Sequence, residues 1–307
     1  MNKKNRIQLT RYLYLFVGLI SLISLVFGSS HFILGLFSHF QAQYLATFIT
    51  LSTLLVIFKD YRFGFLAVIH ILVLLTILPP ILPYEIDVHL ERQPHILSMN
   101  VNGYKETYPE TIKYIDESKP EVLMLTEVPE TLDIDLIEYL NDVYGTAITA
   151  NSYGYTGCGI WSQEIRMWES PYSATQFSYP VCITESKDAF YIAAHPLPPI
   201  TDSLRDTQLK HFNELEVLVN ELKIYDKEIY LAGDFNASIY NGDFAAFIGS
   251  INGKTENIQS WFPLSPLSLA IDHIITIDVD DQYIHERTIT PKLESDHRGI
   301  LFYQVSR

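Results

Sequence analysis

Cysteine is scarce in this sequence. The 307 residues contain two, Cys158 and Cys182, and neither belongs to a Cys-x-x-Cys or mixed Cys/His spacing. Zinc fingers take their ligands from such clusters, so this absence argues against a zinc finger. Two interpretations of the pair stay open, a single disulfide and two buried free thiols.

Positive charge is also scarce. Lys and Arg number 21 against 36 Asp and Glu, which gives a formal net charge of −15. A protein that holds nucleic acid on a broad surface needs clustered Lys and Arg against the phosphates, so the composition disfavours that class. A phosphoester substrate is still compatible with it, because bound metal ions can supply the positive charge.

The charge is unevenly distributed along the chain. Residues 1–84 hold six of the basic residues and one acid, Asp60, so this part carries +5 and residues 85–307 carry −20. The split predicts two regions, an apolar membrane anchor over 1–84 and an acidic, water-compatible domain over 85–307. No internal repeat or low-complexity linker is visible in either.

Long apolar runs are abundant in the first region. They are Tyr12–Gly28, Tyr44–Phe58 and Phe63–Pro83. A membrane-spanning helix needs about 20 mostly apolar residues, with about 17 as the lower limit. The first and third runs meet that length, and the second meets it only if it borrows from residues 32–43. We predict about three transmembrane helices; the alternatives are a cleaved signal peptide over the first run and buried helices of a soluble domain.

The basic residues predict an orientation for this anchor. They lie before the first run and in the connection Lys59–Arg62, whereas residues 29–43 carry no charge. Cytoplasmic loops are enriched in Lys and Arg, so we expect the N-terminus and the second connection in the cytoplasm. Three spans then place residues 85–307 on the outer, periplasmic or extracellular, side of the cell membrane, and two spans would leave them in the cytoplasm.

The second region changes to short β-rich runs bounded by turn residues. Helices are predicted at 107–118 and 206–223, and strands at 95–99, 121–125, 158–162, 190–194, 228–232, 271–277 and 299–305. Strands outnumber helices and alternate with them irregularly. This pattern predicts a two-layer or four-layer α/β or α+β domain.

Polar side chains gather where the predicted strands end. They are Asn100, Asn102, Glu127, His195, Asp234, Asn236, Asp272, Asp296 and His297. A single acid after a strand is commonly a turn residue. An ordered set of carboxylates, amides and histidines at several strand ends predicts instead a site on which a sheet converges.

The motifs around these residues form a recognisable set. They are N-V-N-G, T-E, A-H-P, G-D-F-N-A, I-D-H and S-D-H-R-G, in this order over Ile96–Leu301. They resemble the endonuclease/exonuclease/phosphatase superfamily of metal-dependent phosphoesterases, and Gly154–Gly159 looks like the family's G-x-x-G-V-G strand entry. The three apolar segments before them are similar to a bacterial membrane-anchored subgroup. The resemblance implies a four-layer α/β sandwich with two packed mixed β-sheets.

The resemblance also implies residues around a divalent ion, Mg²⁺ or Mn²⁺. Glu127 would be a metal ligand, Asn100 would support the metal shell or the phosphate, and Asp296 would complete the shell or orient a ligand. Asn102 stands where some members carry Asp, and its amide oxygen can still face a metal. Carboxylates completed by water and substrate suit Mg²⁺.

The same resemblance implies the groups that act on the phosphoester. His297 would be the general base or polarise the phosphate, and Asp272 would orient it. Asp234 would position or deprotonate the attacking water, and Asn236 would donate to a phosphoryl oxygen. His195 would contact the phosphate or serve the leaving group.

Other residues near the motifs carry weaker signals. Tyr155 is either a phosphate-contacting residue or a turn aromatic, and Arg205 either reaches an anionic substrate or pairs with an acid. His211 is expected on a helix surface and His273 in the core or on the surface. Trp261 is expected to pack rather than to stack on a base.

The leading hypothesis is a membrane-anchored phosphoesterase that hydrolyses a phosphomonoester or phosphodiester by attack of metal-activated water. The lack of basic clusters favours a lipid or small-molecule substrate over duplex nucleic acid, and membrane lipids around the anchor would raise the local concentration of a lipid substrate. A DNA or RNA nuclease of the same fold is the alternative, and a non-catalytic binding module is a third. Specificity is expected in loops such as Asp243–Pro266.

Overall fold

The computed structural model describes most of the chain. The described residues are 2–77, 92–105, 107–128, 134–145, 148–150, 157–162, 179–262, 268–279 and 283–306. The predicted boundary between the two regions, at residue 84, lies outside them, and so does Tyr155.

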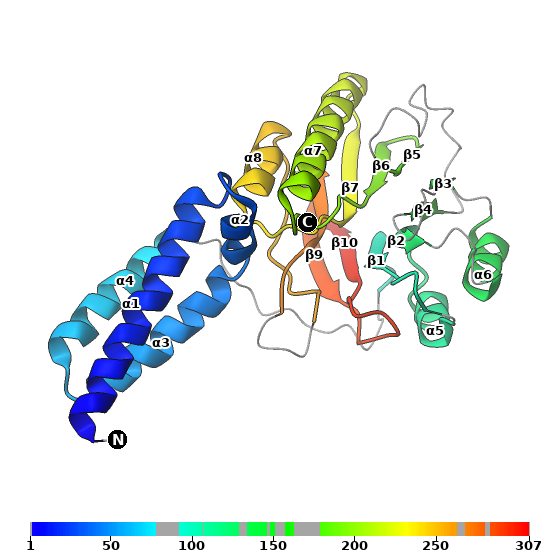
Figure 1. Ribbon diagram of the computed structural model, residues 1–307. Helices are drawn as coiled ribbons and strands as arrows, with labels where there is room; N and C mark the ends of the chain where they lie inside the picture. The colour runs from blue at the N-terminus through cyan, green and yellow to red at the C-terminus, as the bar shows by residue number, and fades with distance from the viewer. Residues whose placement is uncertain are drawn as a thin grey trace.

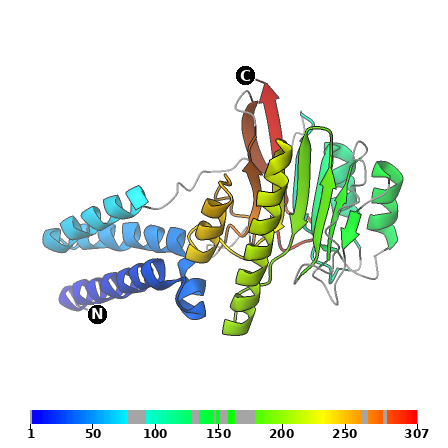
Figure 2. The same ribbon diagram turned by 90° about the horizontal axis from the view of Figure 1, so that it is seen from above.

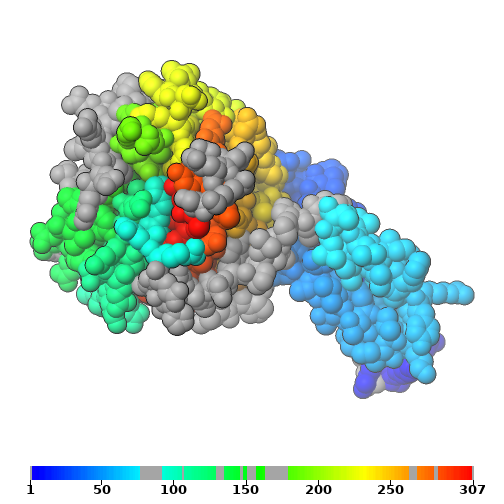
Figure 3. Space-filling model, turned by 180° about the vertical axis from the view of Figure 1, so that it is seen from behind, coloured from blue at the N-terminus to red at the C-terminus, as the bar shows by residue number. Residues whose placement is uncertain are grey.

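Helices make up the N-terminal region. They are α1 (Lys3–Phe27), α2 (Phe32–Ser38), α3 (Gln41–Ile57) and α4 (Tyr61–Ile77). Helices α1, α3 and α4 pack into an elongated bundle that projects away from the sheets, with the N-terminus at its far end (Figure 1). Seen from behind, the bundle extends from one side of a rounded domain (Figure 3).

Helix α1 buries small polar side chains and exposes large apolar ones. Its buried residues are Thr10, Tyr14, Ser21 and Ser24, while Phe16, Leu19 and Leu22 are each more than half exposed. The Ser21 hydroxyl donates to Gln41 Oε1 at 2.7 Å, and Gln41 Nε2 donates to Ser24 Oγ at 3.0 Å. Polar contacts therefore join α1 to α3 inside the bundle.

Helix length bears on the predicted membrane spans. Among the described residues, α1 is the one helix long and apolar enough to cross a membrane, and α2 with α3, bent by 61° at their junction, would make a second span if they act as one. Helix α4 is apolar but shorter. The three predicted runs thus fall in α1, α3 and α4, and the number of spans stays a prediction.

Two sheets form the second region. The six-stranded sheet has the order β3 (Ile148–Ala150), β4 (Gly157–Trp161), β2 (Val122–Val128), β1 (Ile96–Asn100), β10 (Ile300–Ser306), β9 (Tyr283–Ile289). The four-stranded sheet has the order β5 (Val181–Glu185), β6 (Ala189–Ala194), β7 (Glu228–Asp234), β8 (Asp272–Ile277). Each sheet is mixed, because β1 pairs with β2 and β6 pairs with β7 in parallel while the remaining pairs are antiparallel.

Helices cover the outer face of each sheet. Helices α5 (Pro109–Ser118) and α6 (Ile134–Tyr144) pack on the larger sheet, and α7 (Asp202–Leu222) and α8 (Gly242–Ser250) pack on the smaller one (Figure 2). The sheets face each other across an apolar layer that includes Ile96, Met124, Tyr230 and Phe302. The predicted four-layer α/β sandwich is confirmed.

The central strands explain why this sequence makes layers. Alternate side chains of a strand point to opposite faces. Ile229 and Leu231 of β7 therefore pack under α7 and α8, whereas Tyr230 and Ala232 face the larger sheet. All four are fully buried, so β7 appears in the sequence as a continuous apolar run.

One detail differs from the sequence expectations, and a second decides between two interpretations that the sequence left open. Residues 242–250, expected to belong to a specificity loop, form α8, because Phe244 and Phe247 insert under α7 and Asn241 caps the helix by accepting from the Phe244 amide at 3.2 Å. Cys158 of β4 and Cys182 of β5 face each other between the sheets as buried free thiols, with their sulfurs 2.7 Å apart.

Candidate active site

The candidate site lies at the carboxyl ends of the two parallel strand pairs. Asn100 ends β1, Glu127 is the penultimate residue of β2, His195 follows β6 and Asp234 ends β7. Polar contacts link the two sheets here, because Asn100 Nδ2 donates to Glu127 Oε1 at 2.9 Å and to Asp234 Oδ2 at 3.1 Å. The packing of the two sheets thus brings together residues that are far apart in the sequence.

Asn100 is fixed in one orientation. Its Oδ1 accepts the backbone N–H of Asn102 at 2.9 Å, so its nitrogen is the atom that faces the two carboxylates. Asn100 therefore holds Glu127 and Asp234 together and presents no oxygen to an ion beside them.

Backbone strain is concentrated at this edge. Asn102, Glu127 and Asn236 all have left-handed φ angles, at 55°, 55° and 50°. Non-glycine residues persist in that conformation only where the surroundings hold them, and such residues cluster at functional sites.

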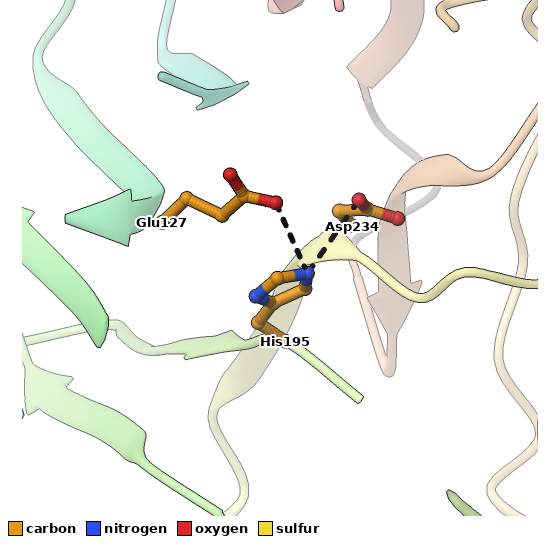
Figure 4. Close-up of side chains that lie close together, drawn as sticks. All are labelled: Glu127, His195 and Asp234. Atoms are coloured by element: carbon orange, nitrogen blue, oxygen red, sulfur yellow. Dashed lines mark ion pairs between the residues drawn. The ribbon is translucent and has the colours of Figure 1, made fainter. Parts of the chain in front are cut away.

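His195 lies between the two carboxylates (Figure 4). Its Nε2 is 3.8 Å from Glu127 Oε1 and 3.6 Å from Asp234 Oδ2. Burial lowers the pKa of His195, but the two carboxylates outweigh burial and the net direction is upward. Burial has the opposite effect on a carboxyl group and raises the pKa of Glu127, and His195 and Asn100 offset this rise only in part.

His297 forms a second group with two carboxylates. Its Nδ1 lies 2.8 Å from Asp272 Oδ2, and its Nε2 lies 3.7 Å from Asp234 Oδ2. Burial opposes the charged ring, but Asp272 and Asp234 outweigh burial and raise the pKa of His297 to about 10. The imidazolium is therefore the stable form at neutral pH.

Asp234 is shared by both groups. Burial alone would raise the pKa of Asp234, but the nearby His195 and His297 bring it down to about 2. Its Oδ1 accepts the backbone N–H of Asn236 at 2.8 Å. Asp234 is thus a buried, ionised carboxylate at the centre of the site.

Asn236 lies at the edge of the first group. Its Nδ2 donates to the Pro196 carbonyl at 3.0 Å and lies 3.3 Å from His195 Nε2. The side chain thereby joins the loop after β7 to the loop after β6.

Two predicted residues lie at the rim. Asn102 Nδ2 donates to Asp296 Oδ1 at 2.9 Å, and the Trp261 indole N–H donates to Asp296 Oδ2 at 3.1 Å. Both oxygens of Asp296 are therefore engaged away from Glu127. The Trp261 ring also packs edge-on against Phe262, with the ring centroids 4.6 Å apart, so Trp261 contributes both packing and a hydrogen bond.

A divalent ion fits the centre of the site better than its rim. Within the described part of the chain, the acidic and histidine groups close enough to share an ion are Glu127–His195–Asp234 and Asp234–Asp272–His297, each with ligand atoms within 4.8 Å of one another. Glu127 is the accessible member, with 21% of its side chain exposed. Carboxylate oxygens of this kind suit Mg²⁺ or Mn²⁺.

One glycine sets the spacing of the site. Gly233 precedes Asp234, has φ of 145°, and a Cβ at this position would lie 2.1 Å from the Ala194 carbonyl oxygen. No other residue fits there without moving β6 from β7, so the absence of a side chain keeps His195 near Asp234.

Ser260 was not among the residues predicted for the site. Its hydroxyl donates to Asp272 Oδ2, the oxygen that also binds His297. Ser260 lies outside every motif, and the contact forms because residues 260–261 pair with Leu269 just before β8.

The prediction that His211 lies on a helix surface is wrong. It is fully buried under the sheet, and burial together with the nearby His195 lowers its pKa to about 3. The signal was present, because Gln208, His211, Leu215 and Leu218 follow one another at helical spacing and are all buried. His273 is in the core, and Arg205 pairs with Asp243 at 2.9 Å rather than facing the site.

A cavity lies away from the candidate site. A space of about 1160 Å³ opens at the amino ends of the same strands, beside His95, Glu121, Asp188 and Glu228. It contains none of the predicted site residues, and its charged lining is mostly acidic.

Comparison with known proteins identifies a family for the second region. A model of the Endonuclease/Exonuclease/phosphatase family matches residues 97–297, which include strands of both sheets and every predicted site residue. None of the curated protein sequences matches the chain.

Solved structures share the fold at low identity. A truncated TDP2 from Caenorhabditis elegans superposes with a TM-score of 0.53 at 13% identity, covering 69% of this chain and 97% of that one. An AP endonuclease from Archaeoglobus fulgidus gives 0.53 at 14%, covering 68% and 98%. A 3′ phosphatase, NExo from Neisseria, bound to product DNA hairpin, gives 0.55 at 16%, covering 68% and 98%.

Proposed function

The chain belongs to the endonuclease/exonuclease/phosphatase family, whose members hydrolyse phosphoesters, and on this premise we propose that it is a membrane-anchored, divalent-metal-dependent phosphoesterase. One observation carries the proposal. Asp234 lies 3.6 Å and 3.7 Å from the Nε2 atoms of His195 and His297, so one buried carboxylate connects two groups of complementary charge at a single strand edge.

The protonation states of Asp234 and His297 suggest a different role for each. Asp234, with a pKa of about 2, is ionised at neutral pH and would orient the attacking water. His297, with a pKa of about 10, is protonated and would donate a hydrogen bond to a phosphoryl oxygen rather than remove a proton. Asp272 and Ser260 would hold the His297 ring in place.

The metal would be held by the carboxylates of the first group. Glu127 and Asp234 would face it, and Asn100 would keep these two side chains together. When bound, Mg²⁺ or Mn²⁺ neutralises phosphoryl oxygens and lowers the pKa of a water molecule. His195 and Asn236 would then be left to contact the phosphate or the leaving group.

Hydrolysis of a chromogenic phosphodiester and monoester by the detergent-solubilised chain tests the proposal. We expect activity with Mg²⁺ or Mn²⁺ that EDTA removes, and a loss of at least about a hundredfold in kcat/KM for Glu127→Gln. Glu138→Gln, on the exposed face of α6, is the matched control and should leave the rate unchanged. Equal rates for the two variants, or no hydrolysis of either substrate, would refute the proposal.

The anchor proposal is supported by the inverted polarity of α1. Its serines meet Gln41 inside the bundle while Phe16 and Leu19 lie outside, as is usual for helices packed in lipid. The Arg11–Asp60 ion pair, at 2.6 Å, joins the start of α1 to the α3–α4 connection at the end of the bundle far from the domain.

This arrangement supports a specific topology. The basic residues in the first turns of α1 and around the α3–α4 connection share one end of the bundle, and the catalytic domain lies at the other. We therefore propose three passes, a cytoplasmic N-terminus and a domain on the outer side. Protease should digest the domain in intact spheroplasts; protection there would reverse the orientation, and a mature chain lacking α1 would support a signal peptide.

The substrate we favour is a lipid or small-molecule phosphoester. The domain carries −20, which opposes a DNA duplex, whereas the anchor would hold the site beside lipid headgroups. Nuclease activity is the second candidate, favoured by the likeness to the NExo structure bound to DNA. Plasmid cleavage that Glu127→Gln abolishes, without release of phosphate or headgroup from lipid vesicles, would decide for the nuclease.

A further inference from the structure

The loop that follows β7 is held from two sides. Within the domain, His273 Nε2 donates to the Ala237 carbonyl at 2.8 Å. From the N-terminal region, His39 Nδ1 lies 3.1 Å from the Ser238 backbone nitrogen and 3.0 Å from Ser238 Oγ. A backbone N–H can only donate, so His39 Nδ1 is the acceptor and the ring carries its proton on Nε2.

The residues after Ser238 extend the contact. Ile239 and Tyr240 pack into the apolar cluster of the bundle that includes Tyr14 and Phe48, and Asn257 Nδ2 donates to the Tyr240 hydroxyl at 2.6 Å. The loop is therefore enclosed between the N-terminal helices and the sandwich.

Two polar contacts close the same junction on either side. Gln43 Nε2 donates to the Ser268 carbonyl at 2.7 Å. Arg205, paired with Asp243, also donates to the carbonyl of Ser29 between α1 and α2. The junction thus orders the segments on both flanks of the loop.

This loop starts directly after the site residue Asp234 and contains the site residue Asn236. Asn236 has a left-handed φ of 50°, a conformation that a non-glycine residue keeps only where its neighbours hold it. Ser238, two residues later, is the residue that His39 binds. Loss of this acceptor would leave a buried amide unpaired beside the strained residue.

We propose that His39 is a positioning residue of the active site, which holds the loop carrying Asn236 so that docking of the N-terminal helices sets the rate of hydrolysis. The inference rests on the proposed phosphoesterase function. It makes the anchor part of the catalytic scaffold and not only a tether.

The experiment compares two amides at position 39 in the full chain. The Asn oxygen occupies nearly the place of histidine Nδ1, whereas the longer Gln places its amide near Nε2. We expect His39→Gln to lower kcat on the chromogenic phosphodiester about tenfold with KM unchanged, and His39→Asn to stay within about threefold of wild type. His31→Gln, at the exposed start of α2, is the matched control.

Hydrogen–deuterium exchange gives a readout that does not depend on activity. Exchange of the amides in residues 235–241 should rise in His39→Gln and not in His39→Asn, while strands β1, β2 and β7 stay protected. Equal kcat in wild type and His39→Gln, or equal loss in both amides, would overturn the proposal. A wild type without hydrolysis would refute the proposed function, and the exchange difference would still decide whether His39 holds the loop.

Discussion

The helical bundle and the sandwich distribute their polar side chains for opposite purposes. In the bundle, Ser21, Ser24 and Gln41 are buried because they bind one another beside an apolar cluster, and the large apolar side chains of α1 lie outside. In the sandwich, apolar side chains fill three layers, and the buried charges Asp234 and His297 gather at one strand edge. Buried polarity joins helices in the first region and forms a candidate site in the second.

The largest expected contrast concerns phenylalanine. Phe302 is fully buried between the sheets, and Phe302→Ala should lower the free energy of unfolding by about 3–5 kcal/mol. Phe16 is 62% exposed on α1, and Phe16→Ala should change it by less than about 0.5 kcal/mol. Denaturant unfolding in detergent, followed by circular dichroism, measures both. Similar losses would mean that Phe16 packs against protein and that the bundle is not inverted.

The second contrast concerns pH. The pKa of His297 is raised to about 10 in the folded domain, so its stabilisation is complete below the ordinary value of about 6.5 and is lost as pH rises through 10. In EDTA, the free energy of unfolding should fall between pH 7 and pH 10 by roughly 3–4 kcal/mol more in wild type than in His297→Asn. His31→Asn, in the exposed α2 cap, should behave as wild type. A parallel fall in all three proteins would show that the ion pair contributes nothing.

The smallest expected effect lies inside the bundle. Gln41→Leu removes the hydrogen bonds to Ser21 and Ser24 and should destabilise the bundle by about 1 kcal/mol, the usual size for polar contacts between helices in lipid. SDS titration followed by circular dichroism measures this, with the exposed Gln8→Leu as control. A stabilised Gln41→Leu bundle would indicate that apolar packing alone joins α1 to α3.

Much of the fold could be predicted because strands and helices have local sequence patterns. The apolar run of β7 and the helical period of α7 are properties of neighbouring residues, so the sequence alone was enough to predict both elements. Helix α8 was not predicted, because it is stabilised by the packing of its two phenylalanines against α7, a contact between residues distant in the sequence. The number of spans cannot be read from length alone, since α3 and α4 lie near the lower limit.

The sequence was enough to predict which residues form the site, but not how they are arranged in space. The strand ends placed Asp234 and Asp272 among the candidates, and it is the pairing of β7 with β8 that sets them opposite each other. Ser260 and His39 make contacts that no sequence motif predicts. Ser260 binds Asp272 within the domain, and His39 binds the Ser238 amide across the junction with the bundle. Asn100 was assigned to the metal shell or to support, and its hydrogen bond from Asn102 favours support.

Gly233 has a consequence for any attempt to redesign this domain. A library that varies this position should return glycine alone, since the Ala194 carbonyl occupies the place of any Cβ. The distance between His195 and Asp234 is therefore a fixed dimension of the scaffold, whatever ion or phosphoester it receives. New specificity has to come from the rim, around Asn102, Trp261 and Asp296, where side chains can change without separating the strands.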